Sequence, residues 1–294
     1  MYRLGIDLGG TKIEGIALTK KKEEIFRFRL LTEQEGGYQH ILHQIKKVYQ
    51  TLLREITEKP HTLGMGTPGA ISPRTGLLKN SNTVCFNGKL TKEELVKLLG
   101  KDFIIENDAN CFALAEALQG AARGKDLVFG VIMGTGCGGG IIHQGRIHTG
   151  LQAIGGEWGH MVIDPNGPLC YCGTHGCVET FISGGGLQKQ YRQKFGESLP
   201  LTEIVQRYRE KDERAQSLMN EFFERFGRAM ANLINILDPD IIVLGGGVSN
   251  IDELYTEGVE QVRKMVFSDS LETPIVKHQL GDSAGVIGAA LIGI

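Results

Sequence analysis

Apolar segments of strand length run into glycine-rich turns at two places in the chain. Residues 3–7 form one such segment, Gly9 and Gly10 supply the turn, and residues 13–18 form an apolar segment that returns. Residues 127–133 likewise lead into a glycine-rich tip at 134–140, after which Ile141 and Ile142 begin a returning strand. We expect a β-hairpin with a polar tip at each place, and the repetition indicates an internally duplicated fold.

Amphipathic segments of helical length alternate with further short apolar strands. Helices are expected at 38–55, 91–99 and 109–118, through much of 187–237, and at 284–291, with strands at 62–66, 103–106 and 241–244. This alternation predicts the α/β class. Small residues interrupt the pattern near Gly120–Gly124, so we divide the chain into an N-terminal domain, 1–120, and a C-terminal domain, 121–294. The C-terminal helix, about 283–294, is a candidate to pack back on the first domain.

The composition narrows the function without choosing it. Of the 294 residues, 41% are hydrophobic and 22% are charged, which is typical of a globular protein with enough chain for two cores. The net charge of -2 creates no field that favours nucleic acid or an anionic membrane, and we expect neither as a partner. Met1 leads directly into a strand and no apolar run is long enough to cross a bilayer, so a soluble, cytoplasmic protein is expected.

The glycine tips have the chemistry of phosphate clamps. Glycine lets backbone N–H groups approach phosphate oxygens, and an acid beside the tip is suited to hold a magnesium ion or its waters. A simple tight hairpin is the competing interpretation, and neither glycine run has the spacing of a Walker loop or a Rossmann fingerprint. The candidates for nucleotide binding are Asp7, Gly9, Gly10, Thr11 and Lys12 at the first tip, Gly134, Thr135 and Gly136 at the second, and Gly245 and Gly246 after the strand 241–244.

Asn107 and Asp108 lie where a strand ends and a helix begins. An Asp at such a junction often caps the helix. The carboxyl end of a strand is also where α/β folds bind ligands, and a kinase needs a carboxylate to take the proton of the attacking hydroxyl. Asp108 is therefore a candidate catalytic base as well as a candidate cap.

Three of the six cysteines, Cys170, Cys172 and Cys177, crowd into one glycine-bent loop. Together with His160, which precedes them, they offer three sulfurs and one imidazole, the ligands of a closed, structural zinc site. His175 is a rival for the fourth position, but it lies within the Cys172–Cys177 turn, where its ring more easily points away. The scattered cysteines are expected to be buried apolar residues: Cys85, Cys111 and Cys137.

Glu157 and Glu179 flank this loop, one just before His160 and one just after Cys177. Surface salt bridges account for most glutamates. If a metal ion fixes the loop, however, both carboxylates are held in place and are suited to bind sugar hydroxyls through charge-assisted hydrogen bonds.

These motifs together resemble the ROK family of bacterial repressors and sugar kinases, within the actin-like ATPase superfamily. The resemblance covers essentially the whole chain and rests on Asp7-x-Gly-Gly-Thr-Lys12, Glu-Asn-Asp-Ala-Asn110, the second glycine tip, Gly-Glu-Trp-Gly-His160, Cys-x-Cys-Gly-x-x-Gly-Cys-x-Glu179 and Asp-Pro-Asp240. It implies a two-domain actin-like (ribonuclease H-like) ATPase fold with a zinc-binding loop at 157–179. It also implies ATP, Mg²⁺ and structural Zn²⁺ as cofactors.

The resemblance also implies roles for individual residues. Asp108 corresponds to the catalytic base, and the sugar-binding positions correspond to Asn82, Asn107, Glu157, His160 and Glu179, with His160 also a zinc ligand. Thr11, Lys12, Gly134, Thr135 and Gly246 correspond to nucleotide-binding positions.

The loop from Pro68 to Thr83 most resembles that of the fructokinase and mannokinase branch. We therefore expect an ATP-dependent fructokinase with some activity on mannose. Glucokinases of the family carry Pro-Asn where this chain has Ser81-Asn82, which argues against glucose as the first choice, and N-acetylglucosamine kinase stays open as an alternative.

A second class of function within the family is a non-catalytic sugar sensor or repressor. The repressors carry a helix-turn-helix domain before the sugar-binding core, whereas here the first phosphate hairpin begins at residue 3. A sensor would not need Asp108 together with two phosphate tips. We therefore expect a kinase, assembled as a homodimer, in which domain closure excludes water while Asp108 draws the proton from a primary hydroxyl.

Overall fold

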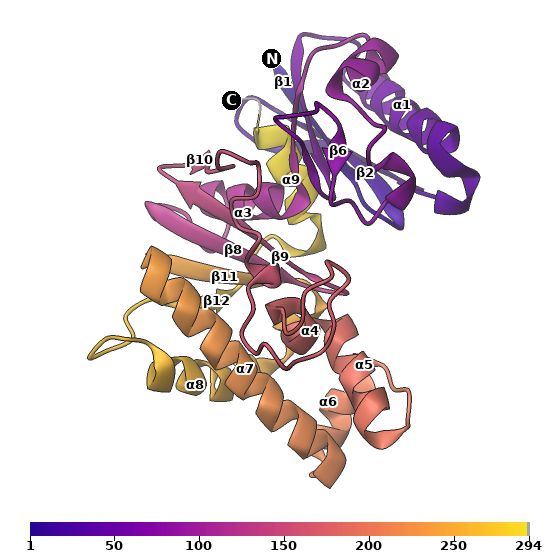
Figure 1. Ribbon diagram of the computed structural model, residues 1–294. Coiled ribbons are helices and arrows are strands. Elements are labelled where there is room, and N and C mark those ends of the chain that lie inside the picture. Colours follow the sequence, from indigo (N-terminus) through magenta and orange to yellow (C-terminus); the bar gives the residue numbers. More distant parts are fainter. Residues whose placement is uncertain (293–294) are drawn as a thin grey trace. The chain divides into compact units, whose positions relative to one another are not determined.

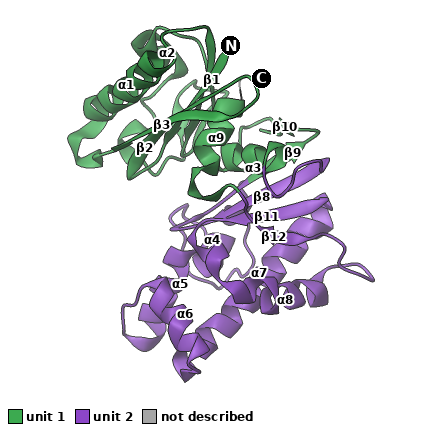
Figure 2. Cartoon of the chain, turned by 180° about the vertical axis from the view of Figure 1, so that it is seen from behind, with its two compact units in different colours: residues 1–119, 140–155, 280–294 green, residues 120–139, 156–279 purple. Residues whose placement is uncertain are grey.

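The computed structural model describes residues 1–292 (Figure 1). The chain divides into two compact units, coloured separately in Figure 2: residues 1–119, 140–155 and 280 onward form unit 1, and residues 120–139 and 156–279 form unit 2. Residues 140–155, which were expected in the C-terminal domain, belong to unit 1, as does helix α9 (Ala284–Leu291). The division into two domains remains a prediction, since these units reflect contacts within the chain.

Each expected hairpin is part of a five-stranded sheet, and the strands of the two sheets follow the same order. The first sheet has the order β3-β2-β1-β4-β7, and the second has the order β10-β9-β8-β11-β12. In the first, β1 pairs antiparallel with β2 and parallel with β4, and in the second, β8 pairs parallel with β11. The repeated order agrees with the predicted duplication, and the α/β class is confirmed.

The strands of the first sheet are β1 (Tyr2–Leu8), β2 (Lys12–Leu18), β3 (Glu24–Leu31), β4 (His61–Thr67) and β7 (Ile104–Asn107). Those of the second are β8 (Leu127–Met133), β9 (Cys137–His143), β10 (Arg146–Ile147), β11 (Ile241–Gly245) and β12 (Ile275–Lys277), and a small hairpin joins β5 (Ala70–Ile71) to β6 (Leu78–Lys79). Because β9 begins at Cys137, the second glycine tip spans 134–136 instead of the expected 134–140.

The other helices are α1 (Gly37–Glu55), α2 (Lys92–Leu99), α3 (Asp108–Leu118), α4 (Val178–Ile182), α5 (Gly184–Phe195), α6 (Leu201–Arg209), α7 (Glu213–Leu237) and α8 (Glu257–Met265). The helical stretch expected across 187–237 is thus three helices, α5 to α7. Within residues 1–292, no helix combines the length and the apolar character needed to span a membrane.

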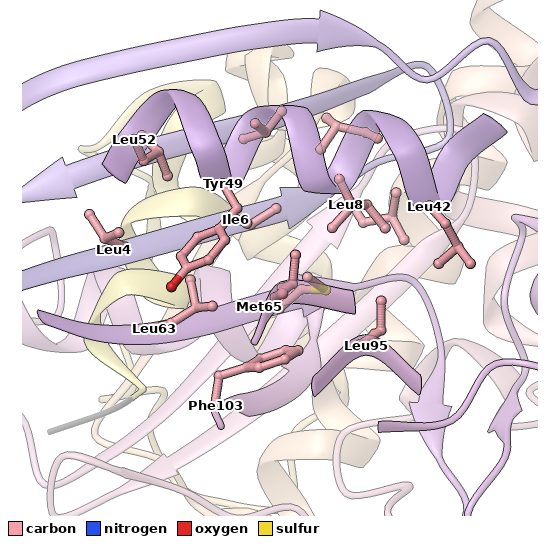
Figure 3. Packing of buried hydrophobic residues seen from close by; sticks show 14 of the residues in the cluster. Leu4, Ile6, Leu8, Leu42, Tyr49, Leu52, Leu63, Met65, Leu95 and Phe103 are labelled. Carbon is pink, nitrogen blue, oxygen red and sulfur yellow. The ribbon is translucent and has the colours of Figure 1, made fainter. Parts of the chain in front are cut away.

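The main core of unit 1 lies between the first sheet and helices α1 and α2. Leu4 and Leu8 of β1, Met65 of β4, Leu52 of α1 and Leu95 of α2 belong to one buried cluster, whose packing Figure 3 shows. Removing these apolar side chains from water stabilises the unit.

The opposite face of the same sheet is covered by α9, which contacts β1 and β4. The strands carry glycine there: a Cβ on Gly5 would lie 2.5 Å from the Ala290 nitrogen, and one on Gly64 would lie 2.0 Å from the Ala289 oxygen. Only glycine therefore lets the helix approach the strands this closely. This packing places the start of α9 beside Asp7, at the end of β1.

Unit 2 is built around β8, β11 and β12, with α7 as its longest helix. All five residues of β11 are buried, and α7 buries Phe222, Phe223 and Phe226. Helix α7 contacts α4, α5, α6 and α8. The strands β8 and β11 end side by side, because Gly245 pairs with Ile132, and their ends carry the glycines singled out from the sequence.

Candidate active site

The first glycine tip is a tight turn closed by its own backbone. The Gly9 nitrogen donates a hydrogen bond of 2.9 Å to the Lys12 oxygen, and a Cβ on Gly9 would lie 2.9 Å from that oxygen. The Gln34 side chain donates to the Gly10 oxygen at 2.7 Å. Thr11 is exposed at the tip, so its hydroxyl is accessible to a ligand.

Lys12 is held beside the tip by an ion pair. Its Nζ lies 3.2 Å from Oε2 of Glu14, a carboxylate whose side chain is 1% exposed. Arg29 also donates to Glu14 at 3.0 Å. Burial opposes the ionisation of Glu14, but hydrogen bonds from Arg29 and Lys12 outweigh it and lower the pKa of this carboxyl group. Glu14 therefore stays charged and keeps Lys12 oriented.

Asp7, at the end of β1, has one buried carboxylate oxygen that accepts no hydrogen bond from residues 1–292. The residue is partly exposed, but its Oδ1 is buried and has no hydrogen-bond partner. Burial, followed by the charges of Asp108 and Glu14, raises its pKa to about 7, although Lys12 opposes the rise. A buried acceptor that attracts no donor from the protein is suited to a cation or its bound water. The Asp7 carboxylate therefore fits the expected Mg²⁺.

Asn107 and Asp108 form the junction between β7 and α3. The Asn107 Oδ1 accepts from the Ala109 nitrogen at 2.9 Å, and its Nδ2 donates to the Gly69 oxygen at 3.2 Å. Asn107, with an extended backbone, is therefore the N-cap, and Asp108 is the first helical residue. The alternative that Asp108 is itself the cap is wrong, although its Oδ1 also accepts from the Ala109 nitrogen at 2.8 Å.

Glu106 precedes this junction and was not identified from the sequence. It accepts hydrogen bonds from Asn110 of α3 at 3.1 Å and from Thr149 at 3.2 Å. Burial raises its pKa, although the hydrogen bonds from Asn110 and Thr149 oppose the rise. Glu106 thus ties the first turn of α3 to the segment 148–155, which lies far from it in the sequence.

Asn82 lies close to the first tip. Its Oδ1 would be 3.7 Å from a Cβ built on Gly10. The loop behind it is fixed by Ser81 and Asn87, which exchange two hydrogen bonds of 2.8 Å. The structure therefore brings Asn82, the first tip, Asp7 and the Asn107–Asp108 junction together within unit 1.

The second tip lies in unit 2, beside the ends of β11 and α4. The Gly134 nitrogen donates to the Gly136 oxygen at 2.9 Å, and the Gly134 oxygen accepts from the Gly184 nitrogen at 2.8 Å. Gly246 has a φ of 77°, and a Cβ there would lie 2.5 Å from the Met133 oxygen. Only glycine fits such a position, for both reasons. The second tip, Gly245 and Gly246 are thus neighbours.

Glu179, near the start of α4, faces the second tip. Its Oε2 accepts from the Cys137 nitrogen at 2.9 Å and would lie 2.5 Å from a Cβ on Gly136. The side chain is therefore held where the tip meets β9, and one carboxylate oxygen remains for a further partner. A groove of about 190 Å³ opens next to it, lined among others by Thr135, Gly185 and Lys189.

The expected metal ligands form one cluster in unit 2. One ligand atom from each of His160, Cys170, Cys172 and Cys177 lies within 4.8 Å of all the others. The Cys172 and Cys177 sulfurs are 3.6 Å apart, and the Cys170 sulfur is 3.7 Å from His160 Nδ1. A zinc tetrahedron with Zn–S bonds of about 2.3 Å has edges of roughly 3.8 Å, so the cluster fits zinc.

His175 is not among the clustered ligands, and its Nδ1 lies 3.0 Å from the Gly167 oxygen. The turn of the loop depends on Gly176, which has a φ of 71°, and a Cβ there would lie 1.5 Å from the Asp164 oxygen. Of the scattered cysteines, Cys111 and Cys137 are buried as predicted, and Cys85 is partly buried.

His160 of the cluster contacts Tyr171, which lies within reach of the charges of the flanking glutamates. His160 directs Nδ1 at Cys170, while its Nε2 lies 3.0 Å from the Tyr171 hydroxyl oxygen. Partial desolvation of that hydroxyl, followed by the charges of Glu179 and Glu157, raises the pKa of Tyr171 to about 12. Tyr171 was not identified from the sequence, where nothing distinguishes it from an ordinary surface tyrosine.

Glu157 is positioned by the residue that follows it. The Trp158 ring is 5% exposed and packs edge-on against Phe129 of β8, with ring centroids 6.1 Å apart. Its Nε1 donates to the Gly138 oxygen at 3.0 Å. Trp158 thus fixes the short segment that carries Glu157 on one side and His160 on the other.

The chain is similar to known proteins over its whole length. A family model described as ROK family matches residues 3–293. The N-acetyl-D-glucosamine kinase of Vibrio atlanticus (strain LGP32) is 36% identical over 300 residues, which cover 99% of this chain and 99% of that protein.

Solved structures of ROK proteins are also similar to this chain over its whole length. The ROK hexokinase of Thermus thermophilus is 32% identical, with a TM-score of 0.89 and coverage of 100% of this chain and 98% of its own. A ROK family glucokinase from Streptomyces griseus, solved in complex with glucose and AMPPNP, is 26% identical, with a TM-score of 0.80 and coverage of 100% of this chain and 99% of its own.

Proposed function

The chain belongs to the ROK family, and we propose that it is an ATP-dependent N-acetylglucosamine kinase acting on a primary hydroxyl of the sugar. The family resemblance and the fold of ROK sugar kinases are confirmed. Full-length similarity to a protein named N-acetyl-D-glucosamine kinase carries the choice of sugar. This similarity favours N-acetylglucosamine over fructose. It does not support the preference for fructose that was expected from the loop 68–83.

The proton acceptor in this proposal is Asp108. The sugar hydroxyl oxygen forms a bond to the γ-phosphorus of ATP while the bond from that phosphorus to the bridging oxygen breaks, and ADP leaves. The hydroxyl proton passes to the Asp108 carboxylate. Asn107 supports this role because it caps α3, which leaves Asp108 at the start of the helix, directly after the carboxyl end of β7.

The phosphates of ATP are assigned to the two tips. In unit 1 the backbone N–H groups of Gly10 and Thr11, with Lys12, and in unit 2 those of Thr135 and Gly136 are suited to hold phosphate oxygens and to stabilise the charge that develops on them. Gly246 extends this surface at the end of β11. Asp7 would hold Mg²⁺ or its waters, and the ion supplies neutralisation of phosphate charge when bound.

The sugar is assigned to the remaining polar groups. In unit 1 these are Asn82 and Asn107, and in unit 2 they are Glu157, His160 and Glu179. Zinc at the cysteine cluster, when bound, supplies a rigid anchor for the loop that carries the last three. A homodimer also stays a prediction.

A substrate panel tests this function. Initial rates with ATP and Mg²⁺ are measured for N-acetylglucosamine, N-acetylmannosamine, glucose, mannose and fructose, with Asp108→Asn as the control that lacks the proton acceptor. N-acetylglucosamine is expected to give the highest kcat/KM. A higher value for fructose would restore the preference expected from the loop, and no phosphorylation of any sugar would favour a non-catalytic sensor.

A further inference from the structure

Tyr171 is an exposed aromatic residue at a restrained position. It lies between Cys170 and Cys172, and its side chain is 75% exposed. The Gly173 nitrogen donates to the Cys170 oxygen at 3.0 Å, which closes the turn around it. A ring so exposed adds little to the stability of the fold, so its place in this turn points to another role.

The Tyr171 side chain is directed at His160. The two rings meet edge-on with centroids 5.2 Å apart, and the hydroxyl oxygen lies 3.0 Å from His160 Nε2. Nδ1 of His160 faces the cysteine cluster, and a metal ion bound there would leave Nε2 as the ring nitrogen that carries the proton. Nε2–H then donates to the Tyr171 oxygen, so His160 acts on the sugar through Tyr171, whose O–H is left to donate to the sugar.

An acetamido group matches what Tyr171 offers. Its carbonyl oxygen accepts a hydrogen bond, and its methyl group gains from contact with an aromatic ring. A sugar with a plain hydroxyl in place of the acetamido group has no methyl to bury. Tyr171 provides the donor and the apolar ring in one side chain, next to the histidine assigned to sugar binding.

We propose that Tyr171 contacts the N-acetyl group of the substrate and gives the enzyme its preference for N-acetylhexosamines over hexoses. This inference rests on the proposed function, because it presumes that N-acetylglucosamine is the substrate. Tyr171 acts here as a specificity residue, whereas Asp108 and the phosphate tips serve every sugar alike.

The test measures kcat/KM for N-acetylglucosamine and for glucose in the wild type, Tyr171→Phe and Tyr171→Ala. Loss of one hydrogen bond in Tyr171→Phe is expected to lower the value for N-acetylglucosamine by roughly 3–10-fold. Loss of the ring as well in Tyr171→Ala is expected to lower it by roughly 10–100-fold, chiefly through KM. The value for glucose should change by less than about 3-fold in both variants.

Phe267→Ala is the matched control, because Phe267 is a surface aromatic residue of unit 2 that is 95% exposed and has no part in the site. Zinc content is measured in each variant to show that the loop is intact. Trp158, the single tryptophan, lies beside Glu157 and allows sugar binding to be followed by fluorescence without turnover. Affinity for N-acetylglucosamine should fall in the order wild type, Tyr171→Phe, Tyr171→Ala.

The outcomes separate this inference from the proposed function. Equal losses for both sugars in Tyr171→Ala, or unchanged values for both, would overturn the inference while N-acetylglucosamine remained the preferred substrate of the wild type. If the wild type does not phosphorylate N-acetylglucosamine, the proposed function fails and the inference fails with it.

Discussion

Asp7 should make the protein less stable as the pH rises, because its carboxylate is partly desolvated and lies near Asp108 and Glu14. Its pKa is raised from 3.8 to about 7 in the folded chain. Between these values the unfolded chain has lost the proton and the folded chain keeps it, so stability falls as pH increases. Each pKa unit corresponds to about 1.4 kcal/mol, so the full cost above pH 7 is at most about 4 kcal/mol.

Asp7→Asn removes this cost. Part of this loss of stability is already present at about pH 5. The difference in unfolding free energy between the variant and the wild type should therefore grow by at most about 3 kcal/mol between pH 5 and pH 8. Because Asp7 is partly exposed, we expect a growth of about 1–2 kcal/mol. The variant should also lose kinase activity, since it no longer offers a carboxylate to Mg²⁺.

The assay is urea unfolding at several pH values in that range, without nucleotide or Mg²⁺. Asp102→Asn is the control, because a hydrogen bond from Lys92 lowers the pKa of this exposed carboxyl group. The pKa of Asp102 then lies below the tested pH range in both the folded and the unfolded chain. The difference in stability between Asp102→Asn and the wild type should therefore not change with pH. If the difference between Asp7→Asn and the wild type is constant across the range, the carboxylate is not the destabilised group that the structure indicates.

Three further changes test other parts of the site. Asp108→Asn should lower turnover by roughly 10²–10⁴-fold with little change in sugar affinity, and near-normal turnover in steady-state assays would exclude it as the proton acceptor. Elemental analysis should find one zinc per chain, and Cys172→Ser should lower both zinc content and sugar affinity, whereas full activity without zinc would contradict an anchoring role. Glu106→Ala leaves Asn110 and Thr149 without their acceptor and should cost about 1–3 kcal/mol in urea unfolding, a loss that Asp102→Ala should not reproduce.

The glycine tips and the cysteine cluster are the features that the sequence predicts best. Their chemistry is local: Gly9 and Gly10 follow directly on a strand, and Cys170, Cys172 and Cys177 share one loop. Residue type and spacing therefore carry most of the information. His160 lies outside that loop, and choosing it over His175 depended on turn geometry that the structure bears out.

Features that depend on distant partners were not predictable. Strand β3 was missed because it is an edge strand whose charged residues, such as Arg29, find their partner Glu14 on the next strand. Glu106 looks like an ordinary acid in the sequence, since its partner Thr149 is 43 positions away. Tyr171 gains its meaning only from the His160 ring beside it.

The most direct test of the proposed function is identification of the product. Wild-type protein is incubated with ATP, Mg²⁺ and N-acetylglucosamine, and phosphorus NMR and mass spectrometry are used to find the ester and its position. We predict an N-acetylglucosamine phosphate bearing the phosphoryl group on the primary hydroxyl, formed together with an equal amount of ADP, and formed roughly 10²–10⁴-fold more slowly with Asp108→Asn. ADP without a sugar ester, or an ester that forms equally well with Asp108→Asn, would contradict the account.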